Sequence, residues 1–141
     1  MTRFATRLTL AAAAFALTAT ASFAQNFADP QPVPFKVEKA QLGIKGPITK
    51  VCPNKATLTA WFFASKPGAV TFRYRKPGGG KSNWITINTK KGAGGINLAT
   101  HVQVAELTKP TETKYMVEVK GYPVISPWVP LKASCSIGLG G

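Results

Sequence analysis

From residue 56 to residue 135, apolar and polar residues alternate with a period of two. Successive side chains of an extended strand point to opposite faces, so each alternating run can bury one face and leave the other in water. An amphipathic helix would need a period of 3.6 residues instead, and that pattern does not appear after residue 24. The apolar members of the runs are Ala56, Leu58, Ala60 and Phe62; Val70, Phe72 and Tyr74; Ile85 and Ile87; Ile96, Leu98, Val102 and Val104; Tyr115, Val117 and Val119; and Val129, Leu131, Ala133 and Cys135.

Turn-forming residues separate these runs and indicate the fold class. Segments rich in glycine and proline lie between the runs, and such segments favour tight turns. One or two further strands are expected between Val37 and Val51. We therefore expect an all-β chain that forms a single antiparallel β-sandwich of seven or eight strands. The turn segments are residues 66–68, 77–80, 92–95, 109–110 and 121–123.

The first 24 residues have the pattern of a secretory signal peptide. Two arginines precede an uncharged apolar run at residues 8–21, and small residues at positions 22 and 24 follow it. The run is shorter than the roughly 20 residues that span a bilayer, so we expect no transmembrane segment. Cleavage is expected after Ala24, with residues 19–21 as an alternative site. The chain is then expected to be exported, either to the periplasm or to the outside of the cell.

Four segments are expected along the chain: the signal peptide at residues 1–24, a leader, a domain and a tail. Residues 25–35 carry three prolines at alternate positions, which disfavour helix and sheet pairing, so we expect a flexible leader there. Residues 36–137 are expected to form the β-sandwich domain, and residues 138–141 a glycine-rich tail. Removal of the signal peptide takes away two arginines, shortens the chain from 141 to 117 residues and lowers its formal net charge from +13 to +11.

The two cysteines, Cys52 and Cys135, are expected to form a disulfide bond. An exported chain enters an oxidising compartment, where a pair of cysteines is normally oxidised. The chain has no Cys-x-x-Cys motif, and its single histidine cannot complete a zinc site with two cysteines. We therefore expect a structural disulfide, no metal and no cofactor.

Residues that support catalysis are few and scattered. The only histidine, His101, is predicted on the outward face of a strand, and the chain has five acidic residues. Residues 80–82 resemble the end of a P-loop, but Arg75 stands at the position of its first glycine and a strand follows in place of a helix. Residues 92–97 lack the third glycine of a dinucleotide-binding motif. The sequence thus predicts neither an enzyme nor a nucleotide-binding protein.

The positive charge favours anionic partners. Fourteen lysines and two arginines remain after signal removal, against five acidic residues. Such an excess attracts polyanions, and lysine acts as a mobile point charge that selects little among them. For an exported protein the expected partner is an anionic polysaccharide or lipid. The alternative is a surface that only keeps the chain soluble and its strand edges apart.

Residues 107–119 are similar to a motif at the turn into the sixth strand of fibronectin type III domains, Leu…Pro…Thr-x-Tyr-x-Val-x-Val. The matching residues are Leu107, Pro110, Thr113, Tyr115, Val117 and Val119. The resemblance covers residues 56–133 and implies a fibronectin III or immunoglobulin-like sandwich. It implies two structural residues: Tyr115, hydrogen-bonded back to the preceding turn, and Trp61, a core residue on the second strand. It also implies that the first strand ends parallel to the last, which brings Cys52 and Cys135 to one end.

The same resemblance places the third, sixth and seventh strands in one sheet with a basic outer face. The outward residues expected to contact an anionic ligand are Arg73, Arg75, Lys114, Lys120, Lys132 and Trp128. Thr71, Met116 and Glu118 are predicted on the same face, with Trp84 at its edge. An alternative is that Glu118 merely pairs with Arg73 or Arg75.

The expected function is that of a small exported, non-enzymatic binding domain for anionic envelope or extracellular polymers. The alternative is a protein-interaction or adhesion subunit whose partner is an envelope protein.

Overall fold

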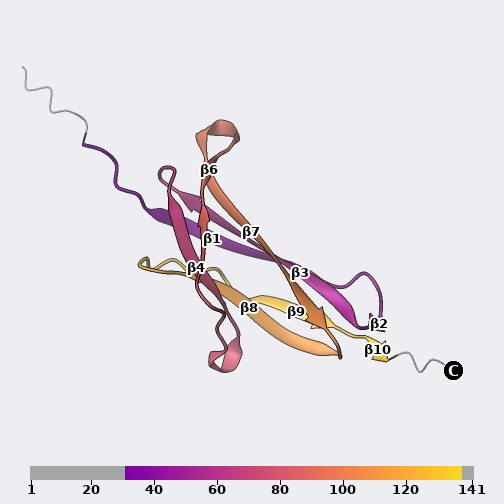
Figure 1. The fold of residues 1–141 in the computed structure, drawn as a ribbon. Coiled ribbons are helices and arrows are strands. Elements are labelled where there is room, and N and C mark those ends of the chain that lie inside the picture. The colour runs from indigo at the N-terminus through magenta and orange to yellow at the C-terminus, as the bar shows by residue number, and fades with distance from the viewer. Residues whose placement is uncertain (1–30, 138–141) are drawn as a thin grey trace, which may run out of the picture. The chain divides into compact units, whose positions relative to one another are not determined.

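The structure is a computed structural model that describes residues 31–137. Within them it contains ten strands, two short 3-10 turns and no α-helix (Figure 1). The predicted signal peptide, the first part of the leader and the tail lie outside the described residues. The strands are β1 (Val37–Lys45), β2 (Val51–Cys52), β3 (Asn54–Ala64), β4 (Ala69–Arg75), β5 (Ile85–Asn88), β6 (Lys90–Lys91), β7 (Asn97–Leu107), β8 (Thr111–Val119), β9 (Val129–Ala133) and β10 (Ser136–Ile137), and the 3-10 turns are η1 (Pro77–Gly79) and η2 (Ala93–Gly95).

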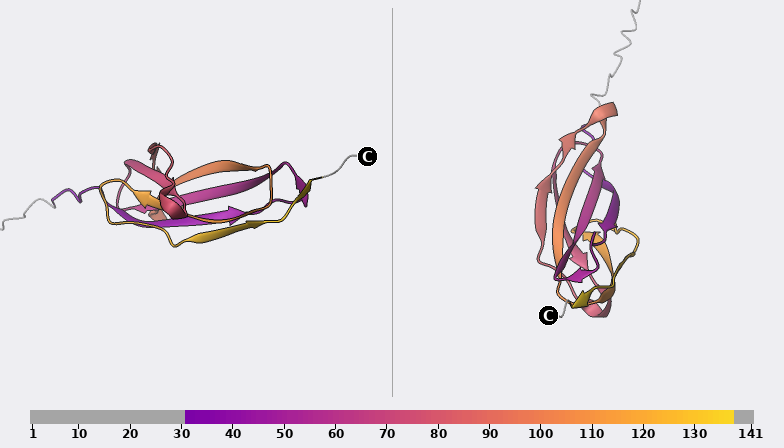
Figure 2. Two further views of the ribbon diagram at one scale, coloured as in Figure 1. Left: turned by 90° about the horizontal axis from the view of Figure 1, so that it is seen from below. Right: turned by 90° about the vertical axis from the view of Figure 1, so that its right-hand side faces the viewer.

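Eight of these strands form two antiparallel sheets of four, which confirms the prediction of an all-β chain with antiparallel sheets. One sheet has the order β1-β3-β7-β6 and the other β5-β4-β8-β9. The remaining two strands, β2 and β10, form a short parallel pair next to one another at the end of the sheets (Figure 1). Figure 2 shows from two further sides how the strands of both sheets run roughly lengthwise.

The alternation of apolar residues fills the space between the sheets. On β3 and β4 the predicted inward positions are all buried. Phe62 of β3 meets Phe72 of β4 across the core, with ring centroids 4.4 Å apart. Core residues on β8 and β9 close the other half of the sandwich, among them Val117 and Leu131. The period-two pattern therefore located the core correctly on these strands.

On β7 the predicted inward and outward faces are wrong. Val102 and Val104, expected in the core, are 57% and 52% exposed, whereas Ala99 and Leu107 are buried. The reason is the register with β3, since directly opposite residues share a face. Phe62 of β3 lies opposite Ala99, so every second residue from Ala99 onward turns inward, including His101. The apolar valines are consequently left on the outer face.

The end of the predicted leader packs against the sandwich. The Ser65 hydroxyl donates a hydrogen bond of 3.0 Å to the carbonyl oxygen of Pro34. The Tyr122 hydroxyl donates one of 3.1 Å to the carbonyl oxygen of Phe35, and the two rings make an edge contact at 6.3 Å. Contacts that tie the chain to the sheets thus begin at Pro34, three residues before β1 and two residues before Lys36.

Cys52 and Cys135 form the predicted disulfide pair. Their Cα atoms are 5.3 Å apart, within the range that a disulfide spans. Cys52 ends β2, and Cys135 directly precedes β10, the strand that pairs with β2 in parallel. The bridge therefore joins the end of the chain to the segment that follows the first long strand.

Candidate functional site

The outer face of the β5-β4-β8-β9 sheet carries the residues that the sequence singled out for ligand binding. On each strand they alternate with core residues: Arg73 and Arg75 flank Tyr74 on β4, and Lys114 precedes Tyr115 on β8. We call this surface the basic face. It comprises Arg73, Arg75, Lys114, Lys120, Lys132, Trp84 and Trp128, together with Glu112 and Glu118.

A carboxylate lies between the two arginines of this face. Arg73 and Arg75 both bind Glu118, Arg73 through Nε and Nη2 to Oε1, and Arg75 through Nη1 to Oε2 at 2.8 Å. Arg73 is opposite Glu118 in the β4–β8 register, which fixes this contact. Burial by itself raises the pKa of the Glu118 carboxyl, but the hydrogen bonds and charges of the two arginines outweigh burial and lower it. The cluster therefore holds its carboxylate ionised and keeps one surplus positive charge.

Replacement of Glu118 by glutamine is expected to destabilise the fold in a pH-dependent way. A carboxyl whose pKa is lowered by folding adds stability above its unfolded pKa, about 4.3, and this stability is lost as the pH falls through the folded value. The variant should have a free energy of unfolding lower by about 1–3 kcal/mol at pH 7, since the hydrogen bonds to a charged group weaken. Urea unfolding at pH 7 and pH 3 measures the difference, which should shrink at the lower pH.

The matched control for this prediction is Glu112→Gln. Glu112 pairs with Lys132 at 2.8 Å, but the two side chains are 74% and 73% exposed, and exposed pairs contribute little. An equal loss of stability for Glu118→Gln at both pH values would contradict the ionised cluster.

Two tryptophans support the cations of the basic face. The Arg73 guanidinium carbon lies 4.2 Å from the centre of a Trp84 ring, and Lys120 Nζ lies 5.7 Å from it. Lys114 Nζ lies 5.4 Å from the centre of a Trp128 ring. The two indoles remain 40% and 41% exposed. The face thus presents aromatic surface and positive charge side by side, held by cation–π contacts.

Met116 is predicted on this face and is buried there. By strand parity it is an outward residue, yet it is only 5% exposed. On one side, Arg75 of β4 lies opposite Met116 in the β4–β8 register. On the other side, Val129 of β9 pairs with Tyr115, so Trp128, the residue before Val129, lies beside Met116. Met116 therefore sits between two large side chains and adds little to the accessible surface.

The structure departs from the resemblance at both residues marked as structural, in the position of Trp61 and in the hydrogen bonding of Tyr115. Trp61 occupies the outer face of the β1-β3-β7 region, where its ring lies over Gly43. A Cβ atom at residue 43 would come within 2.9 Å of that ring. Because Phe62 takes the core position of β3, its neighbour Trp61 must face outward. Trp61 is thus a packing residue of the outer face and not a core residue.

Tyr115 is buried as expected but does not make the implied corner. Within residues 31–137 its hydroxyl forms no hydrogen bond to the preceding turn. Its ring lies beneath Lys76 instead, with Nζ 5.1 Å from the ring centre. Tyr115 and residues 108–109 of that turn both line one cleft.

This cleft, of about 630 Å³, lies between the two sheets beyond the end of β4. β4 pairs with β8 only as far as Arg75 and Met116, so the first half of β8 faces β7 without a β4 neighbour. The cleft walls include Gln103, Ala105 and Leu107 of β7 and the first inward residues of β8. Three lysines, Lys76, Lys81 and Lys109, line this end cleft together with one acidic residue, Glu106.

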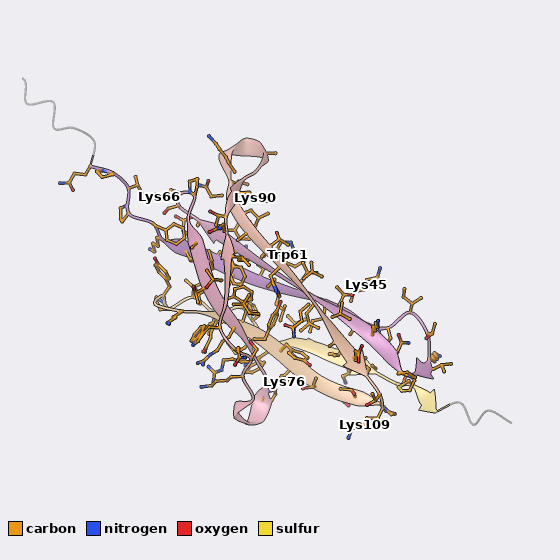
Figure 3. The ribbon with its side chains drawn as sticks, viewed as in Figure 1. Lys45, Trp61, Lys66, Lys76, Lys90 and Lys109 are labelled. Carbon is orange, nitrogen blue, oxygen red and sulfur yellow. A yellow bond between two sulfur atoms is a disulfide. The ribbon has the colours of Figure 1, made fainter. Side chains whose placement is uncertain are left out.

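Two turns carry these lysines. The β4–β5 hairpin holds Lys76 and Lys81, and Gly78 and Gly79 adopt positive φ angles of 76° and 87° at its tip. Lys109 belongs to the turn between β7 and β8, and Figure 3 shows Lys76 and Lys109 at this end of the sheets. The sequence did not predict that these three lysines lie close together, although residues 80–82 resemble the end of a P-loop. Their common position follows from both turns lying at one end of the sandwich.

His101 and Tyr74 form a polar contact inside the sandwich. The Tyr74 hydroxyl and His101 Nδ1 share a hydrogen bond of 3.0 Å, and the His101 ring also contacts Phe72. Burial raises the pKa of Tyr74 to about 12 and lowers the pKa of His101. Both side chains are therefore neutral at pH 7, and His101 is not the outward surface residue that the sequence predicted.

Residues 31–137 contain no group of three or more His, Cys, Asp or Glu side chains placed to hold a metal ion. Over the same range, no helix is long and apolar enough to cross a membrane. No protein-family model matches this chain, and no curated protein has a similar sequence.

Proposed function

We propose that this chain is a small exported, non-enzymatic binding domain of the fibronectin III or immunoglobulin-like class. The strand orders support the class, since β1-β3-β7-β6 and β5-β4-β8-β9 correspond to the two sheets of such domains, with a short extra strand at the edge of the second. The predicted signal peptide supports export, to the periplasm or beyond the cell.

The proposed ligands are anionic polymers of the cell envelope or the extracellular space, bound at the basic face. One observation carries the proposal: five cationic side chains and two half-exposed tryptophans share one sheet face with only two carboxylates. Within residues 31–137, Lys114 and Lys120 have no carboxylate partner. These two ammonium groups are the cations of the face that a ligand can engage without breaking an ion pair.

In the proposed binding mode the tryptophans and the arginine cluster have different roles. Exposed indole faces suit the apolar faces of sugar rings, and the lysines beside them suit carboxylate or sulfate groups. Arg73 and Arg75 are held by Glu118, so they raise the local positive potential but offer few free donors. Binding of this kind attracts polyanions with modest selectivity and depends strongly on salt.

Retention on a heparin resin tests this function with a charge-matched pair of variants. Lys114→Gln with Lys120→Gln should elute at clearly lower salt than the native chain. If each lysine releases about one counterion, the slope of log affinity against log salt should fall by about 2. The control is Lys45→Gln with Lys55→Gln, which removes the same charge from β1 and β3 of the other sheet. Equal elution of the two variants would show that only net charge acts and would eliminate the basic face as a site.

A second proposed function is that of a protein-interaction or adhesion subunit with an envelope partner. The observation that favours it is a long strand edge on β7, outside the basic face, that has no strand partner within residues 31–137.

A further inference from the structure

One edge of the sandwich is open over most of a strand. β7 pairs with β3 along its whole length, but on its other side β6 reaches only Asn97 and Leu98. From Ala99 to Leu107 the second edge of β7 has no strand partner in the described part of the chain. Such an edge offers a row of backbone N–H and C=O groups to any other extended chain.

The other three sheet edges carry features that discourage pairing. β1 is interrupted by a register shift between Val37 and Lys39 and carries charged residues near both ends, Glu38, Lys39 and Lys45. β5 has four residues, and β9 has five with Pro130 among them. Short strands, bulges, prolines and charges are the usual ways in which proteins protect an edge. Between Ala99 and Leu107 there is no proline, no register shift and a single charged residue, Glu106.

The two faces beside this edge differ in chemistry. On the outer side Val102 and Val104 are more than half exposed. On the inner side the neighbouring residues Gln103, Ala105 and Leu107 line the end cleft, where Lys76, Lys81 and Lys109 stand. A strand added here would place alternate side chains along the exposed valines and the others over the lysine-bearing cleft.

We propose that the edge of β7 from Ala99 to Leu107 binds an extended peptide segment of a partner protein in which acidic and apolar residues alternate. This inference rests on the second proposed function and names the chemistry of its partner. The backbone of the peptide pairs with β7, its acidic side chains meet the three lysines, and its apolar side chains cover Val102 and Val104. Charge complementarity selects a foreign acidic segment over a second copy, because this chain carries a formal net charge of +13, or +11 after removal of the predicted signal peptide.

The test uses a synthetic capped peptide of alternating Glu and Val, equal in length to Ala99–Leu107. Binding is measured by titration calorimetry and by amide hydrogen exchange of the whole chain. We expect saturable binding and slowed exchange at those amides of Ala99–Leu107 that do not donate to β3. A peptide of the same composition, in an order that breaks the alternation, should bind about tenfold more weakly, since it cannot place both residue types on their matching sides.

Variants separate this site from general attraction between charges. Lys76→Gln, Lys81→Gln and Lys109→Gln together should weaken the alternating peptide about tenfold. Lys45→Gln, Lys55→Gln and Lys66→Gln together should weaken it far less at equal net charge. Val102→Thr with Val104→Thr should also weaken binding while keeping strand propensity, because it removes the apolar contact.

Four results would overturn the proposal. Equal binding of both peptides would show that alternation does not matter, and slowed exchange outside β7 would place the peptide elsewhere. A concentration-dependent dimer with protected β7 amides in the absence of peptide would assign the edge to a second copy. If an envelope partner binds the β7 variants as tightly as the native chain, the protein-interaction function is retained but the β7 edge is not its binding site. Heparin retention through Lys114 and Lys120 reports on the first function independently.

Discussion

Replacement of Phe72 by alanine is expected to lower the free energy of unfolding by about 3–5 kcal/mol, the range for deleting a fully buried phenylalanine side chain. Phe72 is completely buried at the centre of β4 and contacts Phe62, Tyr74 and His101. These contacts join the two sheets, so the cavity left by alanine opens in the middle of the core. Domains of this size have a total stability of about 5–15 kcal/mol, so the loss is a large part of the whole. Urea unfolding followed by tryptophan fluorescence measures it.

The neighbour Thr71 provides the control for this prediction. Its side chain faces outward and shares a hydrogen bond of 2.9 Å with the Thr86 hydroxyl on β5. Thr71→Ala should cost about 0.5–1.5 kcal/mol, the range for a single hydrogen bond. If the two variants were equally stable, Phe72 would not occupy the core position that the strand parity gives it.

Removal of the disulfide by Cys52→Ser with Cys135→Ser is expected to cost about 2–5 kcal/mol, the typical loss for a small secreted domain. The two cysteines are separated by 83 positions, and the bridge therefore restricts most of the unfolded chain. In the folded chain it ties β10 to β2, a pair of strands with only two residues each. Thermal unfolding of the oxidised native chain and of the double variant gives the difference in stability.

A measurement of intact mass after alkylation without reductant complements that comparison. The native chain should take up no label, because both thiols are oxidised. Two labelled thiols would contradict the bridge, and an unchanged melting temperature in the double variant would mean that the bridge adds no stability. Ser134→Ala, next to Cys135, is a control for substitution at this position of the chain.

Much of the fold could be predicted from the sequence. The alternation around Phe62, Phe72 and Val117 depends only on the geometry of a single strand, in which every second side chain shares a face. The disulfide could be predicted because the two cysteines have no other partner. The same alternation predicts that Arg73 and Lys114 point outward, so the residues proposed to contact a ligand could be chosen from the sequence alone.

The errors arose where a second strand decides the outcome. The alternation of β7 read alone favours an inward Val102 and an outward His101, but the register with β3 turns His101 inward. The resemblance implies a corner hydrogen bond for Tyr115, but within residues 31–137 its hydroxyl makes none to that turn, and its ring lies beneath Lys76 instead. Strand parity allows Glu118 to pair with either Arg73 or Arg75, and in the structure it pairs with both.

The sequence by itself determined the main strands between residues 56 and 133, which of their faces are apolar on all of them but β7, and that two cysteines are available for one bridge. These properties are local, because they depend on side-chain alternation, turn residues and composition. Only the tertiary structure decided that Lys76, Lys81 and Lys109 line one cleft, beside the edge of β7 that has no strand partner in the described part of the chain. Such proximity depends on where each strand ends relative to its neighbours, which is set by packing between the sheets and not by any single segment of the chain.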